Sequence, residues 1–426
     1  MIRIFKYGEV APEEIFARFE PPVDVSGVVA GIIAAVREKG DAALREYART
    51  FDKAELTALE VSPEEIEAAL AQVEPALLDI LRKGAANIRA FHSRQVRNSF
   101  IINDAPGIVI GQKVIPLDRV GLYVPGGTAA YPSTVLMDSI PAKIAGVREL
   151  VITTPPRPDG TVNPVILTAA HTAGVDRVFK CGGAQAVAAL AYGTESVPRV
   201  DKIVGPGNAF VAEAKRQVFG QVAIDMIAGP SEIRVVADGK TNPVWCAADL
   251  LSQAEHDRLA SAVLVTDSPE LAAAVQAEIE RQLPLLEREE IARASIENNG
   301  KIIVADSLEQ AISIANEIAP EHLELCVDTP FDWLDRIRHA GSVFLGRHCP
   351  EALGDYFAGP NHTLPTSGTA RFSSPLSVDD FVKKSQYTYY TREALQAVAP
   401  DIAVFARAEG LTGHAASALS RMEEDQ

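Results

Sequence analysis

Cysteine and long apolar stretches are scarce in this sequence, and their scarcity excludes several classes of protein. The 426 residues include only four cysteines, and no two of them form a CxxC pair. We interpret all four as reduced cytosolic thiols: Cys181, Cys246, Cys326 and Cys349. No apolar run approaches the roughly 20 residues that cross a bilayer. The first residues, Met1 to Lys6, run directly into polar sequence, which predicts that there is no signal peptide. We therefore expect a soluble cytoplasmic protein.

Positive charge is also in short supply. The chain has 57 acidic and 40 basic residues, and its net charge is -17. This imbalance argues against sequence-independent binding of nucleic acid and against binding to an anionic membrane surface. Hydrophobic residues make up 47% of the chain, which is too many for a disordered protein. The length predicts two or more domains with a large core.

The N-terminal part of the sequence shows helical periodicity. Residues 1 to about 60 are typical of an arm with short amphipathic helices, and the helical spacing over residues 28–47 is interrupted at Gly40. Ser62 begins a capping box. A long helical region is expected to follow to about residue 94, with a bend or break at Pro75.

From residue 119 the pattern changes to strands that alternate with helices, which indicates a parallel sheet. The expected strands of the first block are 120–124, 150–153, 177–180 and 202–204, and those of the second are 262–266, 301–304 and 342–345. Helices are expected at 184–192, from 209 to 218, at 269–282 and at 308–318. Two short helices, 391–398 and 414–422, are expected to end the chain.

Glycines mark the points where three strands of the first block meet helices: Gly126-Gly127, Gly182-Gly183 and Gly205-Pro206-Gly207-Asn208. Glycine lets the backbone approach a ligand, and a helix N-terminus attracts phosphate. The third glycine of GxGxxG is missing after Gly205, so the standard Rossmann fingerprint is absent. Each turn alone is more simply explained as a tight turn. Three of them in one domain favour a nucleotide or phosphate site.

Four polar side chains form a candidate metal site. Gln253 and His256 lie three residues apart at the end of an expected helix that Asn242 caps, so both should project from one helix face. Asp355 lies in a glycine-rich loop, and His414 lies at a helix start, where the dipole favours a neutral imidazole. Capping, an Asx-turn or an exposed tail would explain each residue singly. Together their oxygen and nitrogen donors suit zinc.

Glu321 and His322 are adjacent and follow an expected helix. They offer two titratable groups that can act in turn as bases. A Pro-Glu-His sequence at a helix end is more often structural, so this pair alone does not establish an active site.

Longer motifs make the interpretation specific. The sequence resembles the histidinol dehydrogenase family over nearly the whole chain from about residue 20. The motifs that carry the resemblance are LYVPGG (122–127), LSQAEHD (251–257), APEHLEL (319–325), GDYFAGPNHTLPTSG (354–368) and EGLTGH (409–414). The resemblance implies oxidation of L-histidinol through L-histidinaldehyde to L-histidine in two NAD-dependent steps, the last of histidine biosynthesis. It also implies zinc and a domain-swapped homodimer.

The resemblance assigns roles residue by residue. It implies zinc ligands at Gln253, His256, Asp355 and His414, the last supplied by the partner chain. It implies Glu321 and His322 as the acid–base pair. The NAD contacts would be Tyr123, Gln185 and Asn208. The substrate contacts would be Ser231, Gln253, His256, His322, Asp355, His362, Glu409 and His414.

The expected chemistry agrees with these residue types, although three other functions stay open. His322 suits removal of the alcohol proton, and Glu321 could activate the water that the aldehyde must gain. A conventional aldehyde dehydrogenase would instead need a cysteine nucleophile, for which Cys349 is the nearest candidate. A zinc hydrolase would use Glu321 to activate water without NAD. The remaining alternative is a nucleotide-binding module without activity.

The expected fold is α/β, with two Rossmann-like parallel-sheet domains, one inserted in the other. We expect an N-terminal arm at 1–22 and an α/β domain with the metal and catalytic residues at 23–118 and 232–368. The inserted NAD-binding domain would span 119–231. Residues 369–426 would form a swapped C-terminal dimerisation tail, because they contain little core of their own.

Overall fold

The computed structural model describes residues 1–17, 24–126 and 130–422. It divides into two compact units, which we call the core region (residues 1–95 and 117–381) and the ribbon region (residues 96–116 and 382–426). Gly127 of the LYVPGG motif and residues 18–22 of the expected arm lie outside the described residues. Within the described ranges, no helix has the length and apolar character needed to cross a membrane.

The core region contains a six-stranded parallel sheet with the strand order β1-β11-β10-β9-β12-β13. Its strands are β1 (Arg3–Lys6), β9 (Glu232–Ala237), β10 (Ser261–Thr266), β11 (Lys301–Val304), β12 (His322–Cys326) and β13 (Ser342–Leu345). Alternate residues of β9 enter two different apolar clusters. One cluster includes helices α10 (Pro243–Ala254), α11 (Pro269–Gln282) and α12 (Glu289–Asn299), and the other includes α13 (Leu308–Ile318). The sheet is therefore covered on both faces, as parallel sheets usually are.

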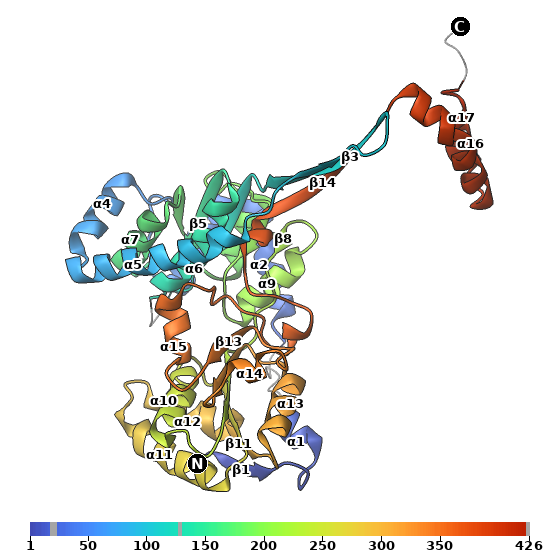
Figure 1. Cartoon of the computed structure of the whole chain (residues 1–426). Helices are drawn as coiled ribbons and strands as arrows, with labels where there is room; N and C mark the ends of the chain where they lie inside the picture. The colour runs from blue at the N-terminus through green and yellow to red at the C-terminus, as the bar shows by residue number, and fades with distance from the viewer. Residues whose placement is uncertain (18–23, 127–129, 423–426) are drawn as a thin grey trace. The chain divides into compact units, whose positions relative to one another are not determined.

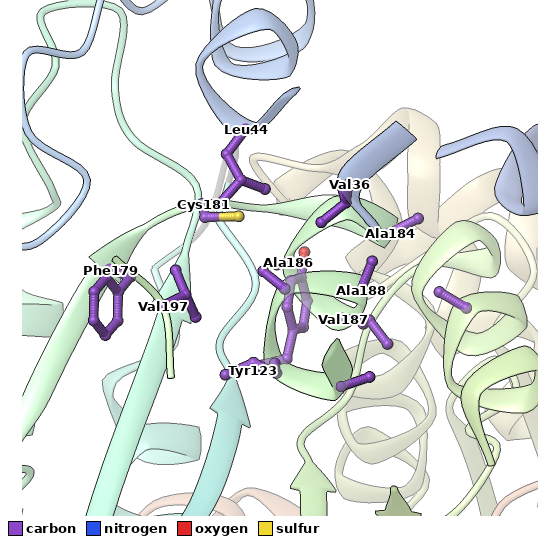
Figure 2. Packing of buried hydrophobic residues seen from close by; sticks show 14 of the residues in the cluster. Val36, Leu44, Tyr123, Phe179, Cys181, Ala184, Ala186, Val187, Ala188 and Val197 are labelled. Atoms are coloured by element: carbon purple, nitrogen blue, oxygen red, sulfur yellow. The ribbon is translucent and has the colours of Figure 1, made fainter. Parts of the chain in front are cut away.

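A second sheet of the core region is five-stranded and also parallel, in the order β6-β5-β4-β7-β8. It consists of β4 (Arg119–Tyr123), β5 (Glu149–Thr154), β6 (Arg177–Lys180), β7 (Lys202–Val204) and β8 (Ala223–Ile224). One apolar cluster joins it to α2 (Ser26–Lys39), α3 (Asp41–Tyr47), α8 (Gly183–Tyr192) and α9 (Ala209–Val218). Another joins it to α4 (Pro63–Gln72), α5 (Pro75–His92), α6 (Pro132–Ala145) and α7 (Pro164–Ala173). Figure 2 shows the first cluster, with Val36 of α2, Leu44 of α3 and the Tyr123 ring among its members. The predicted α/β class with two parallel sheets is confirmed.

Local signals placed several helices correctly. The break at Gly40 separates α2 from α3, where this glycine has a φ of 53°. Ser62 accepts a hydrogen bond from the Glu65 N–H, and the Glu65 carboxylate accepts one from the Ser62 N–H, which completes the capping box of α4. Pro75 begins a new helix, α5, so the predicted break is confirmed.

Part of the expected helical arm was wrong. Residues 3–6 form β1, which pairs in parallel with β11 at the edge of the six-stranded sheet. Ile2 is buried in the cluster beneath that sheet, so burial of its side chain fixes the segment there. Of the first 17 residues, only α1 (Pro12–Phe16) is helical.

Shorter elements complete the core region. They are a π-helical segment η1 (Ala48–Asp52), the 3-10 turns η2 (Ser93–Gln95), η3 (Leu283–Leu285), η5 (Thr369–Arg371) and η6 (Val378–Phe381), and helices α14 (Phe331–Leu334) and α15 (Glu351–Leu353). A π-helical turn, η4 (Gly354–Ala358), directly follows α15. It carries Asp355, within a stretch where the sequence indicated only loop.

The ribbon region has an antiparallel sheet of β2 (Phe100–Ile102), β3 (Ile108–Pro116) and β14 (Val382–Tyr390), in the order β14-β3-β2. Helices α16 (Arg392–Ala408) and α17 (Thr412–Leu419) follow β14 and pack on each other (Figure 1). The predicted helix 391–398 was too short, because α16 continues through Pro400. Packing of Ala403 and Ala406 against α17 holds the helix together beyond the proline.

Candidate active site

Glu321 and His322 lie at the amino end of β12, beside the amino end of β9. The first residue of β9, Glu232, holds both through its backbone. Its N–H donates to Glu321 Oε2 over 2.8 Å, and its carbonyl oxygen lies 3.0 Å from His322 Nδ1. A neutral His322 therefore carries its proton on Nδ1 and leaves Nε2 free to accept another.

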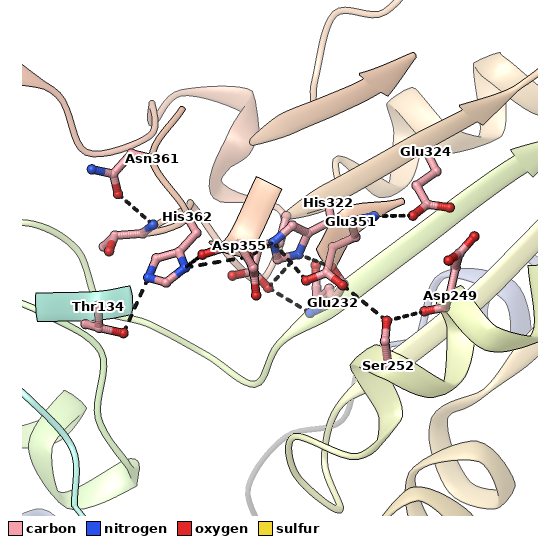
Figure 3. A network of polar contacts seen from close by, with 12 residues as sticks. Thr134, Glu232, Asp249, Ser252, His322, Glu324, Glu351, Asp355, Asn361 and His362 are labelled. Atoms are coloured by element: carbon pink, nitrogen blue, oxygen red, sulfur yellow. Dashed lines mark hydrogen bonds and ion pairs between the residues drawn. The ribbon is translucent and has the colours of Figure 1, made fainter. Parts of the chain in front are cut away.

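Two further carboxylates face the free nitrogen of His322. Its Nε2 lies 3.8 Å from Glu351 Oε1 and 3.7 Å from Asp355 Oδ1. Figure 3 shows these side chains pointing toward one another from β12, α15 and η4. His322, Glu351 and Asp355 each offer a ligand atom, and these atoms lie within 4.8 Å of one another, so the cluster could hold a metal ion.

Burial and charge shift the pKa values of the catalytic candidates. Burial raises the pKa of Glu321 to about 8, although His322 and the Glu232 N–H act in the opposite direction. Burial alone would lower the pKa of His322. The neighbouring carboxylates of Glu321, Asp355 and Glu351 have the larger, opposite effect, and the pKa rises to about 10. Burial also raises the pKa of Asp355, yet His322 and His362 hold it well below its usual range. The site thus gathers the carboxyl groups of Glu321, Glu351 and Asp355 around one imidazole, and this set of donors could bind a cation.

Gln253 contributes a buried side-chain amide to this site. It lies near the end of α10 and is fully buried, and neither its amide oxygen nor its amide nitrogen has a hydrogen-bond partner among the described residues. A buried amide left without partners destabilises the fold unless some group binds it. Its neighbour Ser252 donates to Glu351 Oε2 over 3.2 Å, which places this helix end beside the acidic cluster.

His256 follows α10 in a turn, since the helix ends at Ala254 and the His256 N–H donates to the Gln253 carbonyl. The expectation that both side chains share a helix face therefore needs correction. Burial lowers the pKa of His256, and the charge of Asp355 acts to raise it. A neutral imidazole that feels the Asp355 carboxylate suits metal ligation.

His362 lies on the other side of Asp355. Its Nδ1 is 3.1 Å from the Asp355 carbonyl oxygen and 3.6 Å from Asp355 Oδ1, and its Nε2 is 3.4 Å from Thr134 Oγ1 of α6. Figure 3 shows Thr134, His362, Asp355 and His322 in sequence along this network. The structure therefore brings together four of the predicted site residues: Glu321, His322, Asp355 and His362.

The predicted cofactor residues lie at the carboxyl edge of the five-stranded sheet. The Gly183 N–H donates to the Tyr123 hydroxyl over 3.2 Å, and Gln185 follows in the first turn of α8, so both flank one glycine turn. A Cβ on Gly205 would lie 2.2 Å from the Tyr123 carbonyl oxygen, so only glycine fits there. Asn208 caps α9 by accepting from the Phe210 and Val211 N–H groups. This capping explains Asn208 without a cofactor, and its NAD contact stays a prediction.

Three further predicted residues belong to other segments of the chain. Ser231 precedes β9, and its carbonyl oxygen accepts from the Ser261 N–H. Glu409 follows α16, and His414 lies in α17; both are exposed in the ribbon region. Their zinc and substrate contacts stay predictions.

Sequence reasoning missed Glu351 and the backbone of Glu232. Glu351 lies four residues before Asp355, a helical spacing that places two carboxylates on one face and could have indicated it. No pattern in the sequence indicates the role of Glu232, because it arises from strand pairing. Gly341 was also missed: a Cβ there would lie 2.6 Å from the Glu321 carbonyl oxygen, so glycine is needed for the close approach of these two segments.

The fold and this site define a class of protein: an α/β enzyme with an adjacent buried Glu and His beside a cluster that could hold a cation. A family model described as histidinol dehydrogenase matches residues 19–422. A histidinol dehydrogenase of Syntrophotalea carbinolica is 58% identical over 413 residues, covering 96% of each chain. One of Clostridium acetobutylicum is 54% identical and covers 99% of each. A crystal structure of histidinol dehydrogenase from Elizabethkingia anophelis matches with a TM-score of 0.94 at 39% identity, covering 99% of this chain and 98% of that one. The chain belongs to the histidinol dehydrogenase family and is a dehydrogenase.

Proposed function

We propose that this enzyme oxidises L-histidinol through L-histidinaldehyde to L-histidine in two NAD-dependent steps, the last of histidine biosynthesis, with the help of zinc. Family membership supports the substrate. The observation that carries the proposal is that the backbone N–H and carbonyl oxygen of Glu232 contact the side chains of Glu321 and His322. Two oxidations that differ in their need for water can use two separate proton acceptors, and these two backbone contacts position one side chain for each role.

His322 serves as the base that removes the alcohol proton. Its Nδ1–H is held by the Glu232 carbonyl, so the proton is taken at Nε2, the nitrogen that faces Asp355 and Glu351. General-base catalysis of this kind contributes roughly 100- to 10,000-fold to a rate. Glu321 serves as the base that activates water against the aldehyde, for which its raised pKa near 8 is suitable.

The residues present fit a zinc ion. Gln253, with its unpartnered buried amide, would hold it together with His256 and Asp355, and His414 of a second chain would complete the four ligands. Zinc held there would bind the imidazole and amine of the substrate, and its charge would offset the carboxylates that raise the pKa of His322. His362, Ser231 and Glu409 would orient the substrate.

Tyr123, Gln185 and Asn208 would bind NAD at the glycine turns. The nicotinamide supplies the redox chemistry of each oxidation. In support, a Cβ on Gly126 or on Gly182 would lie within 2.7 Å of the Pro155 side chain, so the turns after β4, β5 and β6 meet at one edge. The carboxyl edge of a parallel sheet is where such folds bind ligands.

The proposed assembly is a cytoplasmic homodimer in which the tail of one chain reaches the site of the other. Its domains would be the arm 1–22, the halves 23–118 and 232–368, the insert 119–231 and the tail 369–426. Exposed apolar side chains of the ribbon region support the dimer, among them Val404 and Phe405.

Formation of NADH from histidinol tests the proposal. We expect two NADH for each histidinol, with histidine as product. Hydrolysis of another substrate, with no NADH formed from histidinol, would instead support a zinc hydrolase. Binding of NAD without turnover would support a nucleotide-binding module. Loss of activity in Cys349→Ala would favour a conventional aldehyde dehydrogenase; we expect this variant to stay active.

Two substitutions test the division of labour between the catalytic pair. Glu321→Gln keeps the size of the side chain and removes its basicity, so it should slow oxidation of histidinaldehyde by on the order of 100-fold and the alcohol step much less. His322→Asn should slow both steps, because each loses an O–H proton. Single-turnover NADH formation from each substrate measures this. Equal slowing of both substrates by Glu321→Gln would contradict the assignment.

Removal of the metal tests the zinc site. A chelator should abolish turnover, and zinc should restore it. Gln253→Ala and His256→Asn should lower the bound zinc, measured by elemental analysis, whereas Glu351→Gln should retain it. The reverse pattern would move the metal to His322, Glu351 and Asp355, the other set of donors in this site.

A further inference from the structure

Helix α6 of the core region holds three consecutive residues of the loop that carries His362. The Asn361 side-chain amide donates to the Met137 carbonyl oxygen over 2.7 Å. The Thr363 hydroxyl donates to Asp138 Oδ1 over 2.7 Å. With the contact between Thr134 and His362, these bonds fix the loop on one face of α6. His362 therefore depends on α6 for its position beside Asp355.

The same Asp138 reaches the turn that begins at Gly205. Its side chain is fully buried, and its second oxygen, Oδ2, lies 3.3 Å from the position of a Cβ on Gly205. This oxygen has no hydrogen-bond partner among the described residues. Gly205 itself is held on both sides, because its N–H donates to Asp225 and its carbonyl oxygen accepts from Lys215. One carboxyl group thus contacts the His362 loop with one oxygen and faces the Gly205 turn with the other.

We propose that Asp138 is a positioning residue that holds the His362 loop and the Gly205 turn in register. The inference rests on the proposed function, which takes His362 as a substrate contact and the Gly205 turn as part of the NAD site. Asp138 touches neither ligand and acts through Thr363 on one side and Gly205 on the other. Burial raises the pKa of Asp138 to about 7, so a neutral side chain of the same shape should replace it.

Direct binding measurements separate the two sides. Dissociation constants for histidinol and for NADH are measured separately by titration calorimetry on the zinc-loaded dimer. Thr363→Val removes only the hydroxyl, so it should weaken histidinol binding by about 3- to 10-fold, the value of one buried hydrogen bond, and leave NADH binding unchanged. Asp138→Ala should weaken both by a similar factor. Asp138→Asn keeps an oxygen that can accept from Thr363 and should restore both constants to within about 3-fold of wild type.

A second buried carboxylate serves as the control. Asp41 accepts hydrogen bonds from Thr194 and Ser196 but contacts neither loop. Asp41→Asn should lower the melting temperature and leave both dissociation constants unchanged. If Asp138→Ala does not fold, Asp138→Ser takes its place with the same expectation.

Three results would overturn the inference: unchanged histidinol binding in Thr363→Val, an effect of Asp138→Ala on one ligand alone, or an equal change of both dissociation constants in Asp41→Asn and Asp138→Ala. A wild-type protein that binds neither histidinol nor NADH would instead contradict the proposed function. The two failures are therefore distinguishable.

Discussion

The core region and the ribbon region differ in how far their large apolar side chains are buried. The core region buries large ones, such as Phe179, Leu122 and Ile152. In the described part of the ribbon region, the buried apolar side chains are all alanines: Ala399, Ala403, Ala406, Ala415 and Ala418. Its large apolar side chains are half-buried or exposed, and the exposed ones are Val96, Phe100, Ile101, Ile102, Ile110, Tyr389, Tyr390, Ile402, Val404, Phe405, Leu411 and Met422.

This difference indicates that the ribbon region would not be stable as an independently folded domain. A small antiparallel sheet and two helices without large buried side chains have little hydrophobic stabilisation of their own. Exposed large apolar side chains in such number are typical of an interface when they form one patch. The region also carries Glu409 and His414, two predicted site residues that face solvent in one chain. Both facts are consistent with a surface that is completed by a second copy.

The largest expected effect comes from exchanging ribbon regions between two inactive chains. Glu321→Gln removes the proposed base of the core region, and His414→Asn removes a proposed ligand of the ribbon region, so each homodimer should make almost no histidine. In a heterodimer, one of the two sites combines an intact core region with an intact ribbon region. Random reassociation should therefore restore about one quarter of wild-type histidine formation.

The control pairs two core-region variants, Glu321→Gln and His256→Asn. A heterodimer of these chains has one defect in each site whichever ribbon region it receives, so it should stay inactive. Two results would contradict a shared site. One is equal recovery of histidine formation in both mixtures, and the other is no recovery in verified heterodimers of Glu321→Gln and His414→Asn.

The next effect concerns two equally exposed phenylalanines. Phe405 of the ribbon region is 71% exposed, and Phe331 of the core region is 74% exposed. Phe405→Asp should raise the dissociation constant of the dimer by about 100-fold, as loss of an interface anchor does. Phe331→Asp should leave it unchanged. Sedimentation equilibrium over a dilution series measures both constants. If both variants change the dissociation constant of the dimer equally, the exposed apolar residues of the ribbon region do not mark the interface.

The sequence predicted the core region better than the ribbon region, for a physical reason. Strands such as β5 and β10 are continuous apolar runs between turn residues, which is how buried parallel strands look. The missed strands β9 and β12 are equally buried but contain charged residues, including Arg234 and Glu324. Contacts from distant segments accommodate these groups: the Ser261 carbonyl accepts from Arg234, and Glu324 accepts from the Glu351 N–H. Local sequence contains no sign of such partners.

The candidate site shows the same limit. Motifs identified Glu321, His322, Asp355 and His362 one by one, and the fold brings these four together. Their arrangement depends on strand pairing between β9 and β12 and on the turn η4, neither of which was predicted. The π-helical turn has no reliable local signature, because its sequence, Gly354 to Ala358, fits a loop equally well.

The smallest expected effect compares a buried carboxyl of the core region with an exposed one of the ribbon region. Burial raises the pKa of Asp138 to about 7, while Asp225 acts to raise it and Lys215 and Thr363 act to lower it. Below about pH 4 this carboxyl is protonated in both the folded and the unfolded chain. Between about pH 4 and pH 7 the unfolded chain releases the proton while the folded chain keeps it, so wild-type stability falls as pH rises.

An asparagine at position 138 has no such proton to release. The free energy of unfolding of Asp138→Asn relative to wild type should therefore increase by on the order of 2 kcal/mol from pH 5 to pH 8. Asp401→Asn, at an exposed position of α16, should change it by less than about 0.5 kcal/mol at either pH. Urea unfolding at the two pH values measures both differences, and a pH-independent difference for Asp138→Asn would contradict the assigned burial of its charge.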